Sequence, residues 1–315
     1  PNNGVLPQAG ILLGNSPLGG EGRPGGRLTV GGWLDADYCW AVEGRLLTLG
    51  EQSVRYSDNS NNNSTLARPF VNLTPQGGGI VGNDAFVISG LGVATGSVNV
   101  NNDADLWVSD VTFRRLLFES PGTEVDLLLG YTTSRIDETL TIQSSSLLAI
   151  GNTLDVFDSF DVENQYQAGH LGFDVDSYDG NWSLRLRGQV SLGSMRQLVR
   201  IRGSQTATAV GLNPVVTNGG LYAQSTNIGD FERQRFVVSP EFDLTLGYQI
   251  SDRVELTAGY MFLYWSRVVQ PGNQIDTSLN PNQPPPLNEP QRPSFSFQEE
   301  GYYVHGLTFG LSAEF

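Results

Sequence analysis

The amino-acid sequence predicts an all-β protein, a closed antiparallel transmembrane up-and-down β-barrel of about twelve strands (range 10–14). Three observations lead to this prediction. Apolar and polar residues alternate with a period of two along most of the chain. The alternation persists well beyond the roughly 5–6 residues of an average strand. Long and short connections also follow one another, as they do in membrane barrels.

The composition excludes several other classes of protein. The chain has 315 residues and a formal net charge of −15, and its 18 basic residues are all Arg. Such an acidic chain is a poor candidate for a nucleic-acid binder. Its single Cys, Cys39, forms no intrachain disulfide and no cysteine metal cluster. No stretch approaches the ~18 consecutive apolar residues of a membrane helix, but barrel strands escape this test because they average to near-neutral hydropathy.

Strands are expected along the whole chain, which we interpret as one domain covering residues 1–315. The last strand is the clearest case, because Tyr303, Leu307 and Phe309 share an apolar face while polar residues and Gly alternate on the other. Aromatic rings near the ends of such faces match the interface girdles of membrane barrels. A large soluble β-sandwich or propeller is the alternative. The expected strands lie near residues 8–14, 27–37, 42–56, 66–73, 84–94, 104–118, 124–142, 160–178, 181–203, 231–250, 253–269 and 301–315.

Hairpin turns predict how the strands pair. A two-residue turn at Asp179-Gly180 sets Val175 against Leu184 and Arg185 against Asp174, so that like faces meet. A three-residue loop around Ser251-Asp252 sets Leu244 against Ala258.

Connections alternate in length from one end of the predicted barrel to the other. Short turns near 120–123, 179–180 and 250–252 are expected in the periplasm. An even number of strands then puts both chain ends there. Residues 1–26 are poorly defined. The long extracellular loops are expected at 57–65, 143–159, 203–230 and the Pro-rich 270–300.

Polar residues on the inward faces of two hairpins are candidates for lining a pore. One interpretation is a charged constriction that tunes solute passage. The other is a set of cross-strand ion pairs that stiffens the wall. The sequence leaves both open. The candidates are His170, Asp174, Asp176, Arg185, Arg187 and Gln189 from one hairpin, and Glu241, Asp243 and Glu255 from the other.

Catalytic and metal-binding motifs are weak. No Ser, Asp or second His stands at a telling position near His170, and His305 falls on the lipid face, so we expect no enzyme and no cofactor. The run 101–105 and the group Asp155, Asp158 and Asp161 offer oxygen ligands for divalent cations in outer loops, but their spacing does not match a dedicated calcium loop.

Several blocks of the sequence resemble a family of bacterial outer-membrane proteins, the putative β-barrel porin of the seventh type. The opening block is Gly26–Asp35, and the closest is Gly259–Asp276. Members of the family carry further chain upstream, so we expect a native start before Pro1. The resemblance implies an outer-membrane barrel and brings no catalytic residue. The other blocks are Val42–Gly44, Leu66–Phe70, Asp126–Tyr131, Asp137–Ile142 and Ser225–Gly229.

The chain end looks like the C-terminal signal that barrel-assembly machinery reads, formed here by Tyr303, Leu307, Phe309, Leu311 and Phe315. The expected location is therefore the bacterial outer membrane, with lipid, lipopolysaccharide and the assembly machinery as partners, and with a homo-oligomer left open. The first functional hypothesis is passive diffusion of small hydrophilic solutes, with cation preference from the acidic balance. The alternative is a plugged structural barrel whose acidic loops contact neighbours or lipopolysaccharide.

Overall fold

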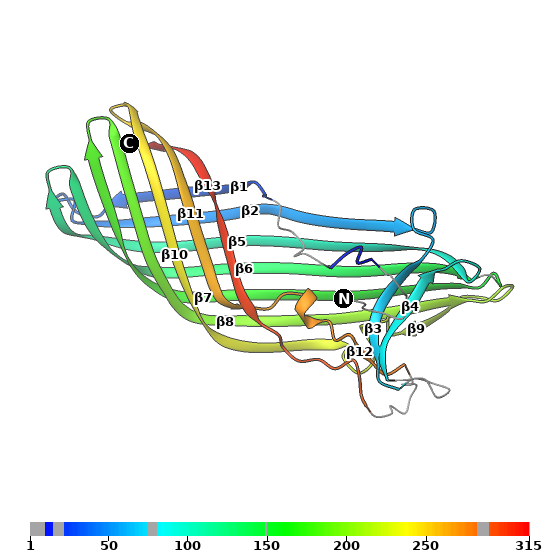
Figure 1. The fold of residues 1–315 in the computed structure, drawn as a ribbon. Helices are drawn as coiled ribbons and strands as arrows, with labels where there is room; N and C mark the ends of the chain where they lie inside the picture. The colour runs from blue at the N-terminus through cyan, green and yellow to red at the C-terminus, as the bar shows by residue number, and fades with distance from the viewer. Residues whose placement is uncertain (1–9, 15–21, 75–80, 149, 282–289, 315) are drawn as a thin grey trace.

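The structure is a computed structural model that describes residues 10–14, 22–74, 81–148, 150–281 and 290–314, and it confirms the all-β class. Within these residues, one antiparallel sheet of ten strands runs in the order β1-β2-β5-β6-β7-β8-β10-β11-β13, with β9 paired to β8 (Figure 1). Its strands are β1 Gly25–Trp33, β2 Trp40–Asn59, β5 Ala94–Ser120, β6 Thr123–Leu148, β7 Thr153–Asp179, β8 Trp182–Thr208, β9 Val215–Asn218, β10 Gly229–Ser251, β11 Val254–Val268 and β13 Glu300–Ala313.

A smaller sheet lies at one end of the long strands. It pairs β3 (Leu66–Asn72) with β4 (Gly82–Ser89) and with the short β12 (Ser278–Leu279). A single turn of 3-10 helix, η2 (Gly272–Gln274), precedes β12. In the part of the chain that the structure describes, no helix has the length and apolar character needed to cross a membrane.

The strands are long because their alternation is interrupted only at tight turns. β5, β7 and β8 have 27 residues each and β6 has 26. Gly122 and Gly180 occupy the tight turns with φ of +76° and +60°, a region that suits Gly. We call the end of the sheet with these turns the turn end and the opposite end the loop end. The corresponding parts of the strands are the turn half and the loop half.

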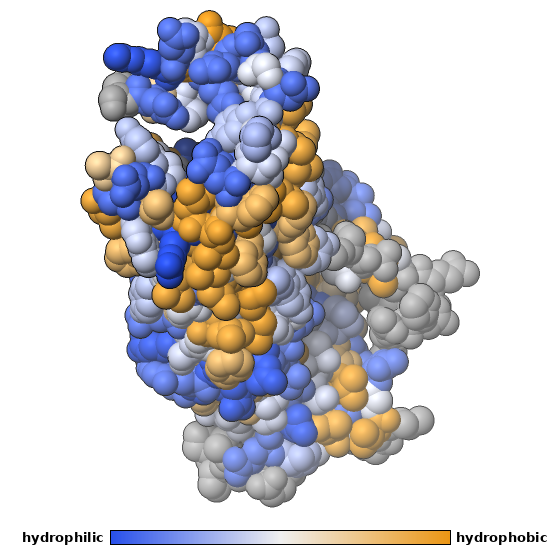
Figure 2. All heavy atoms as spheres, turned by 90° about the vertical axis from the view of Figure 1, so that its left-hand side faces the viewer, coloured by the Kyte–Doolittle hydropathy of each residue, from blue (hydrophilic) through white to orange (hydrophobic). Residues whose placement is uncertain are grey.

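The outer face of the turn half is apolar. Leu129, Phe173 and Leu192 expose about half of their surface there, and Phe309 exposes 80%. Figure 2 shows this apolar band with hydrophilic residues above and below it. In the loop half the outer face becomes polar, with partly exposed charges such as Arg135 and Asp137. The apolar band therefore marks the segment of the strands that suits a hydrocarbon environment.

The inner face has the opposite pattern. In the turn half of β7 it carries Asp174 and His170, whereas in the loop half it carries Tyr166 and Phe160, all of them buried. The prediction of a polar interior is therefore confirmed for the turn half and wrong for the loop half. The reason is that the outer face of the loop half is polar, so its apolar residues pack inward as in a soluble protein.

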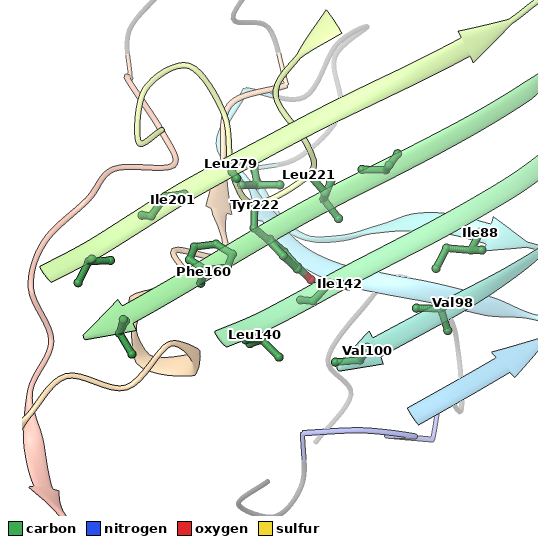
Figure 3. Packing of buried hydrophobic residues seen from close by; sticks show 14 of the residues in the cluster. Ile88, Val98, Val100, Leu140, Ile142, Phe160, Ile201, Leu221, Tyr222 and Leu279 are labelled. Atoms are coloured by element: carbon green, nitrogen blue, oxygen red, sulfur yellow. The ribbon is translucent and has the colours of Figure 1, made fainter. Parts of the chain in front are cut away.

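Segments from the loop end fill this apolar interior. Leu221 and Tyr222 between β9 and β10, and Leu279 of β12, pack against Phe160 and Ile201 on the inner faces of β7 and β8 (Figure 3). Ile88 of β4 joins the same cluster. Closer to the turn end, Met195, Met261, Leu106, Ile136 and Trp265 form a second buried cluster. The loop half is thus a packed core rather than a water-filled channel.

The sheet is rolled, because side chains from its first strands meet strands near its other end. Arg27 of β1 forms an ion pair with Asp243 of β10, and Arg45 of β2 forms one with Glu241 of β10. In the described residues β1 and β13 form the two edges of the sheet and do not pair with each other. Both run toward the turn end, so that direct pairing between them would be parallel.

Three of the expected wall strands are absent from the wall. Residues 10–14 of the expected strand 8–14 are not a strand, and residues 8–9 lie outside the described part. The expected strands 66–73 and 84–94 correspond to β3 and β4, which form the separate small sheet. Their alternation is real, but it buries Leu66 and Ile88 against the core inside the sheet. The continuous path of the sheet has nine strands, one fewer than the expected range of 10–14, and the short β9 beside β8 brings the sheet to ten.

The predicted hairpin registers are wrong by two residues. Asp174 pairs with Arg187 and Asp176 with Arg185, because the turn is centred on Gly180-Asn181. At the neighbouring hairpin Leu244 pairs with Tyr260, through a two-residue turn with a bulge after Gln249. A slip of two keeps every side chain on its predicted face, so the inward and outward assignments survive.

The predicted outer loops are shorter than expected. Strands β6 and β7 continue through most of 143–159 and leave only 149–152 between them, and β8 runs on to Thr208. Of the Pro-rich loop 270–300, residues 282–289 lie outside the described part. The strand extensions form the loop half. The outer residues of the loop half are polar, so this half lacks the apolar outer face that marks a membrane-spanning strand.

Replacing Phe160 by Ala tests whether the loop half has a true core. Phe160 is fully buried on the inner face of β7, so the change is expected to cost about 3–5 kcal/mol of unfolding free energy. Phe157 is the matched control, because it lies three residues away on the outer face of the same strand and is only partly buried. Its replacement by Ala is expected to cost about 1 kcal/mol. Urea unfolding followed by Trp fluorescence measures both, and equal losses would contradict a packed interior.

Candidate functional site

The interior of the turn half is a layer of buried ion pairs centred on Arg187 of β8. Its guanidinium donates to both carboxylate oxygens of Glu43 on β2, at 2.5 and 3.1 Å. It also donates to Asp174 Oδ2 on the adjacent strand β7, at 2.7 Å. The forked guanidinium matches a carboxylate in this bidentate geometry. One side chain therefore joins β2 to β7 and β8 through the interior.

Arg45 of β2 makes a second link across the interior. Its Nε donates to Asp110 Oδ2 on β5 at 2.8 Å, and its Nη2 donates to Glu241 Oε2 on β10 at 2.8 Å. Gln189 of β8 donates to the same Glu241 oxygen at 2.7 Å. All four side chains are buried. The links made by Arg45 and Arg187 place side chains where an open lumen would run.

Ion pairs between neighbouring strands complete the layer near the turn end. Arg114 of β5 donates to Asp126 on β6 at 3.0 Å and to Asp176 on β7 at 3.3 Å. Arg185 donates to the other oxygen of Asp176 at 2.6 Å, and 44% of its side chain is exposed. Asp243, besides its pair with Arg27, accepts a hydrogen bond from Thr245.

His170 is held by two hydroxyl groups. Its Nε2 lies 3.0 Å from Thr112 Oγ1 and its Nδ1 lies 2.9 Å from Thr132 Oγ1. A Cβ on Gly130 would lie 2.5 Å from His170 Nε2 and 2.1 Å from the carbonyl oxygen of Val111, so this position needs Gly. With both ring nitrogens engaged, His170 serves to cross-link the wall.

The structure places every candidate for the pore lining on the inner side of the sheet. Asp174, Asp176, Arg187, Gln189, His170, Glu241 and Asp243 are buried, whereas Arg185 is half-exposed. Glu255 lies nearest the turn end, where it accepts a hydrogen bond from Ser183. All nine candidates face inward, but most are engaged in side-chain contacts. Their role in solute passage stays a prediction.

Sequence reasoning missed half of this layer. Arg27, Glu43, Arg45, Asp110, Arg114 and Asp126 belong to strands whose alternation was recognised, and their places on the polar face were visible in the sequence. The alternation of apolar and polar residues therefore indicated that these six side chains face inward. No signal identified their partners, because Glu43 and Arg187 are 144 positions apart.

A second polar contact holds the loop segments inside the loop half. Arg68 of β3 donates to Asp158 Oδ2 of β7 at 2.5 Å, and Asp158 Oδ1 accepts the backbone N–H groups of Tyr222 and Ala223 at 2.9 and 2.7 Å. The Arg68 guanidinium also lies 4.5 Å from the centre of the Tyr222 ring. Asn164 of β7 binds both backbone groups of Val269 at 2.9 Å.

The same contacts correct the proposed cation site at Asp155, Asp158 and Asp161. These residues lie in strand β7 rather than in a loop, and alternation places Asp158 inside and the other two outside. Asp158 forms an ion pair with Arg68, and Asp161 forms one with Arg200 at 3.3 Å. Asp155 accepts a hydrogen bond from Ser145 at 2.5 Å. The run 101–105 likewise lies within β5. The three carboxylates therefore do not converge on one ion.

Glu138 of β6 lies on the inner side between the two apolar clusters. It is 7% exposed, beyond the apolar band, and forms a side-chain hydrogen bond with Gln270. Burial raises its pKa to about 7. Arg23 lowers the pKa, and the carboxylate of Glu300 raises it further. A carboxyl group that is neutral at acidic pH is thus built into the contact between the wall and the segment that follows β11.

The residues of the expected C-terminal signal lie on the outer face of β13. Tyr303, Leu307, Phe309 and Leu311 are exposed by 63% or more, and His305 is exposed on the same face. Phe315 lies outside the described residues. The outer face of the last strand is thus apolar except at His305.

Fold and interior together define a class of protein: an antiparallel β-sheet of long strands, rolled around a filled interior, with an apolar outer band over its turn half. Comparison with models of protein families agrees, since the model of putative beta barrel porin-7 (BBP7) matches residues 1–315. The chain belongs to this family, which confirms the resemblance seen in its sequence. Neither the search of curated proteins nor that of solved structures gave a match.

Replacing Arg187 by Gln is expected to destabilise the protein far more than replacing Arg185 by Gln. The first change leaves Glu43 and Asp174 buried without their counter-charge, which costs about 3–5 kcal/mol. The second removes a half-exposed Arg and leaves Asp176 with Arg114 as a partner, so a loss of about 1 kcal/mol is expected. Both residues face inward on the same strand and carry the same charge. Equal urea midpoints for the two variants would rule out a closed ionic layer.

Glu138 is expected to make stability fall as the pH rises from 5 to 8. In the unfolded chain the carboxyl ionises near 4.5, whereas the folded state keeps its proton until about pH 7. The folded state therefore binds more protons in this window, and stability decreases with pH by up to about 3 kcal/mol. Glu138→Gln should flatten the dependence, measured as urea midpoints across the pH series. If the slope of stability against pH is unchanged in Glu138→Gln, groups other than Glu138 cause the pH dependence.

Proposed function

We propose that this protein is an outer-membrane β-barrel whose turn half crosses the membrane and whose sheet is closed at the edges formed by β1 and β13. The apolar outer band of the turn half supports this placement, as does membership of a β-barrel porin family. An open sheet edge in hydrocarbon would leave backbone N–H and C=O groups without partners, at a cost of several kcal/mol each. Closure removes that cost.

The geometry favours a plugged barrel over an open diffusion pore, and the single observation that carries this conclusion is Arg187. Its guanidinium joins Glu43 on β2 with Asp174 on β7 through the interior. Nine strands form the continuous path of the described sheet, and a barrel of about eight strands is just wide enough for side chains to fill. The loop half is filled in addition by the segments packed around Tyr222 and Leu279.

A plugged barrel serves a structural or surface role. Its loop half extends the wall beyond the apolar band and presents charged residues to water, which suits contacts with neighbouring proteins or lipopolysaccharide. The outer apolar face of β13 suits recognition by barrel-assembly machinery, and the net charge of −15 argues against nucleic acid. A homo-oligomer remains part of the proposal, as do divalent cations at the outer loops, although not at Asp155, Asp158 and Asp161. No catalytic role is proposed, since both ring nitrogens of His170 form hydrogen bonds with Thr hydroxyl groups.

Planar-bilayer recordings test the plugged interior. The wild-type protein is expected to give no steady ohmic steps, because the ionic layer occupies the lumen. The double variant Arg45→Ser, Arg187→Ser removes the two side chains that reach across the turn half, but it is expected to stay silent because the segments around Tyr222 and Leu279 still fill the loop half. A small current is expected when the β3–β4 hairpin (residues 60–93) and residues 209–228 are deleted as well. Cations should carry this current, because carboxylates outnumber guanidinium groups in the layer.

Arg185→Ser with the same deletions is the matched control, because it removes an inward Arg that lies at the rim and does not reach the opposite wall. It is expected to stay silent. Ohmic steps from the wild type would show an open pore and contradict the proposal. A reversal potential that favours chloride in a salt gradient would contradict the cation preference.

A further inference from the structure

Three Arg side chains share one carboxylate at the point where β10, β11 and the segment before β13 meet. Arg233 and Arg235 come from β10, Arg267 comes from β11, and Glu299 directly precedes β13. Arg233 pairs closely with Glu299. Arg235 and Arg267 lie farther away, with Nε atoms 3.9 and 3.7 Å from its oxygens. We call these four residues the arginine cluster.

Positive charge is in excess at this cluster, although the chain as a whole carries −15. Among the described residues, Glu299 is the carboxylate that the Arg235 and Arg267 guanidinium groups approach. Their side chains are 45% and 51% exposed, so their remaining N–H donors are open to a ligand. Burial, together with the charges of Arg235 and Arg267, lowers the pKa of Arg233, and Glu299 opposes the shift.

The cluster has a rigid base. Gln197 of β8 is fully buried, and its side-chain oxygen accepts a hydrogen bond from Arg233 Nε at 2.7 Å. The amide of Gln197 also donates to the backbone oxygen of Arg267 at 3.3 Å. The Arg233 guanidinium lies 4.2 Å from the centre of the Phe297 ring. One buried side chain thus positions two of the three Arg residues before any ligand arrives.

Arg135, Arg196 and Arg200 of the loop half also share one carboxylate, Glu163, but each has a further carboxylate partner. These further partners are Asp137, Glu232 and Asp161. Arg196 donates to both oxygens of Glu232 at 2.7 Å, so its charge and fork are already matched by a single carboxylate. The arginine cluster differs because, among the described residues, Glu299 is the one carboxylate that pairs with its three guanidinium groups. Forked donors of this kind suit the three terminal oxygens of a phosphate group.

The cluster also lies at the margin of the apolar band. Phe236, which follows Arg235 directly, is 62% exposed on the outer face, so Arg235 lies on the inner side of the sheet at the level of this margin. Tyr303, 63% exposed, lies on β13 only a few residues after Glu299. In a barrel embedded through its turn half, this margin is the level of lipid head groups.

We propose that the arginine cluster is a binding site for a phosphate monoester, held by Arg235 and Arg267 above the anchored Arg233. The phosphate belongs either to a membrane lipid head group or to a soluble molecule. The lipid source rests on the proposed membrane placement, whereas the binding of soluble phosphate does not.

The first test uses inorganic phosphate and the purified full chain in an uncharged detergent, with binding followed by calorimetry. The double variant Arg235→Gln, Arg267→Gln is expected to bind phosphate at least about tenfold more weakly than the wild type. Arg196→Gln is the matched control, since it removes an exposed Arg whose charge is already paired, and it should stay within about twofold. Heat-dependent mobility on gels confirms that each variant is folded.

Glu299→Gln provides a test of opposite sign. It removes the carboxylate that competes with phosphate, so binding should tighten about threefold. Weaker binding by this variant would overturn the site. So would the absence of saturable binding by the wild type, or equal losses in the cluster variant and the Arg196 control.

A second arm distinguishes the two sources. Protein binding is compared between vesicles of phosphatidylcholine alone and vesicles that also contain phosphatidic acid, a lipid with a phosphate monoester. A preference for the second vesicles that disappears in the double variant supports a lipid source. Binding of soluble phosphate without that preference supports a soluble one. Because the first test needs no membrane, failure of the site and failure of the proposed membrane placement give different results.

Discussion

The structure depends on one electrostatic constraint: charged groups removed from water inside the sheet must be paired. An unpaired guanidinium or carboxylate in a buried position costs several kcal/mol, and the turn half buries many of both. Arg45 and Arg187 meet this constraint by taking partners on strands that are not their neighbours. The pairs therefore hold the first strands against β7, β8 and β10, and the curvature of the sheet follows from them.

The outer faces of the two halves of the long strands differ in polarity, and the patterns of inward and outward residues are reversed between the halves. In the turn half, apolar residues such as Leu171 and Phe173 face outward and Asp174 faces inward. In the loop half, Phe160 and Tyr166 face inward, and charged residues such as Asp161 face outward. Strand geometry stays the same throughout. The change of pattern along one strand marks the position at which the apolar band ends.

A filled interior gives the loop segments a defined place. Asp158 fixes the backbone of Tyr222 and Ala223 while it pairs with Arg68 of the β3–β4 hairpin, so one buried carboxylate joins two insertions to the wall. Asn164 does the same for Val269. Without these contacts the connecting segments would extend into water. With them, the segments form part of the core. At the margin of the apolar band, the same packing brings Glu299 to Arg233 and leaves the neighbouring Arg residues open.

The sequence by itself determined which residues of a strand share a face, because alternation with a period of two is a local property. It therefore identified Asp174, Arg187, Glu241 and the other inward candidates. It did not determine register, since a slip of two residues leaves the pattern unchanged. It also did not reveal that the β3–β4 hairpin lies inside or that Arg187 meets Glu43. Those features arise from contacts between residues far apart in the chain, which only the tertiary structure brings together.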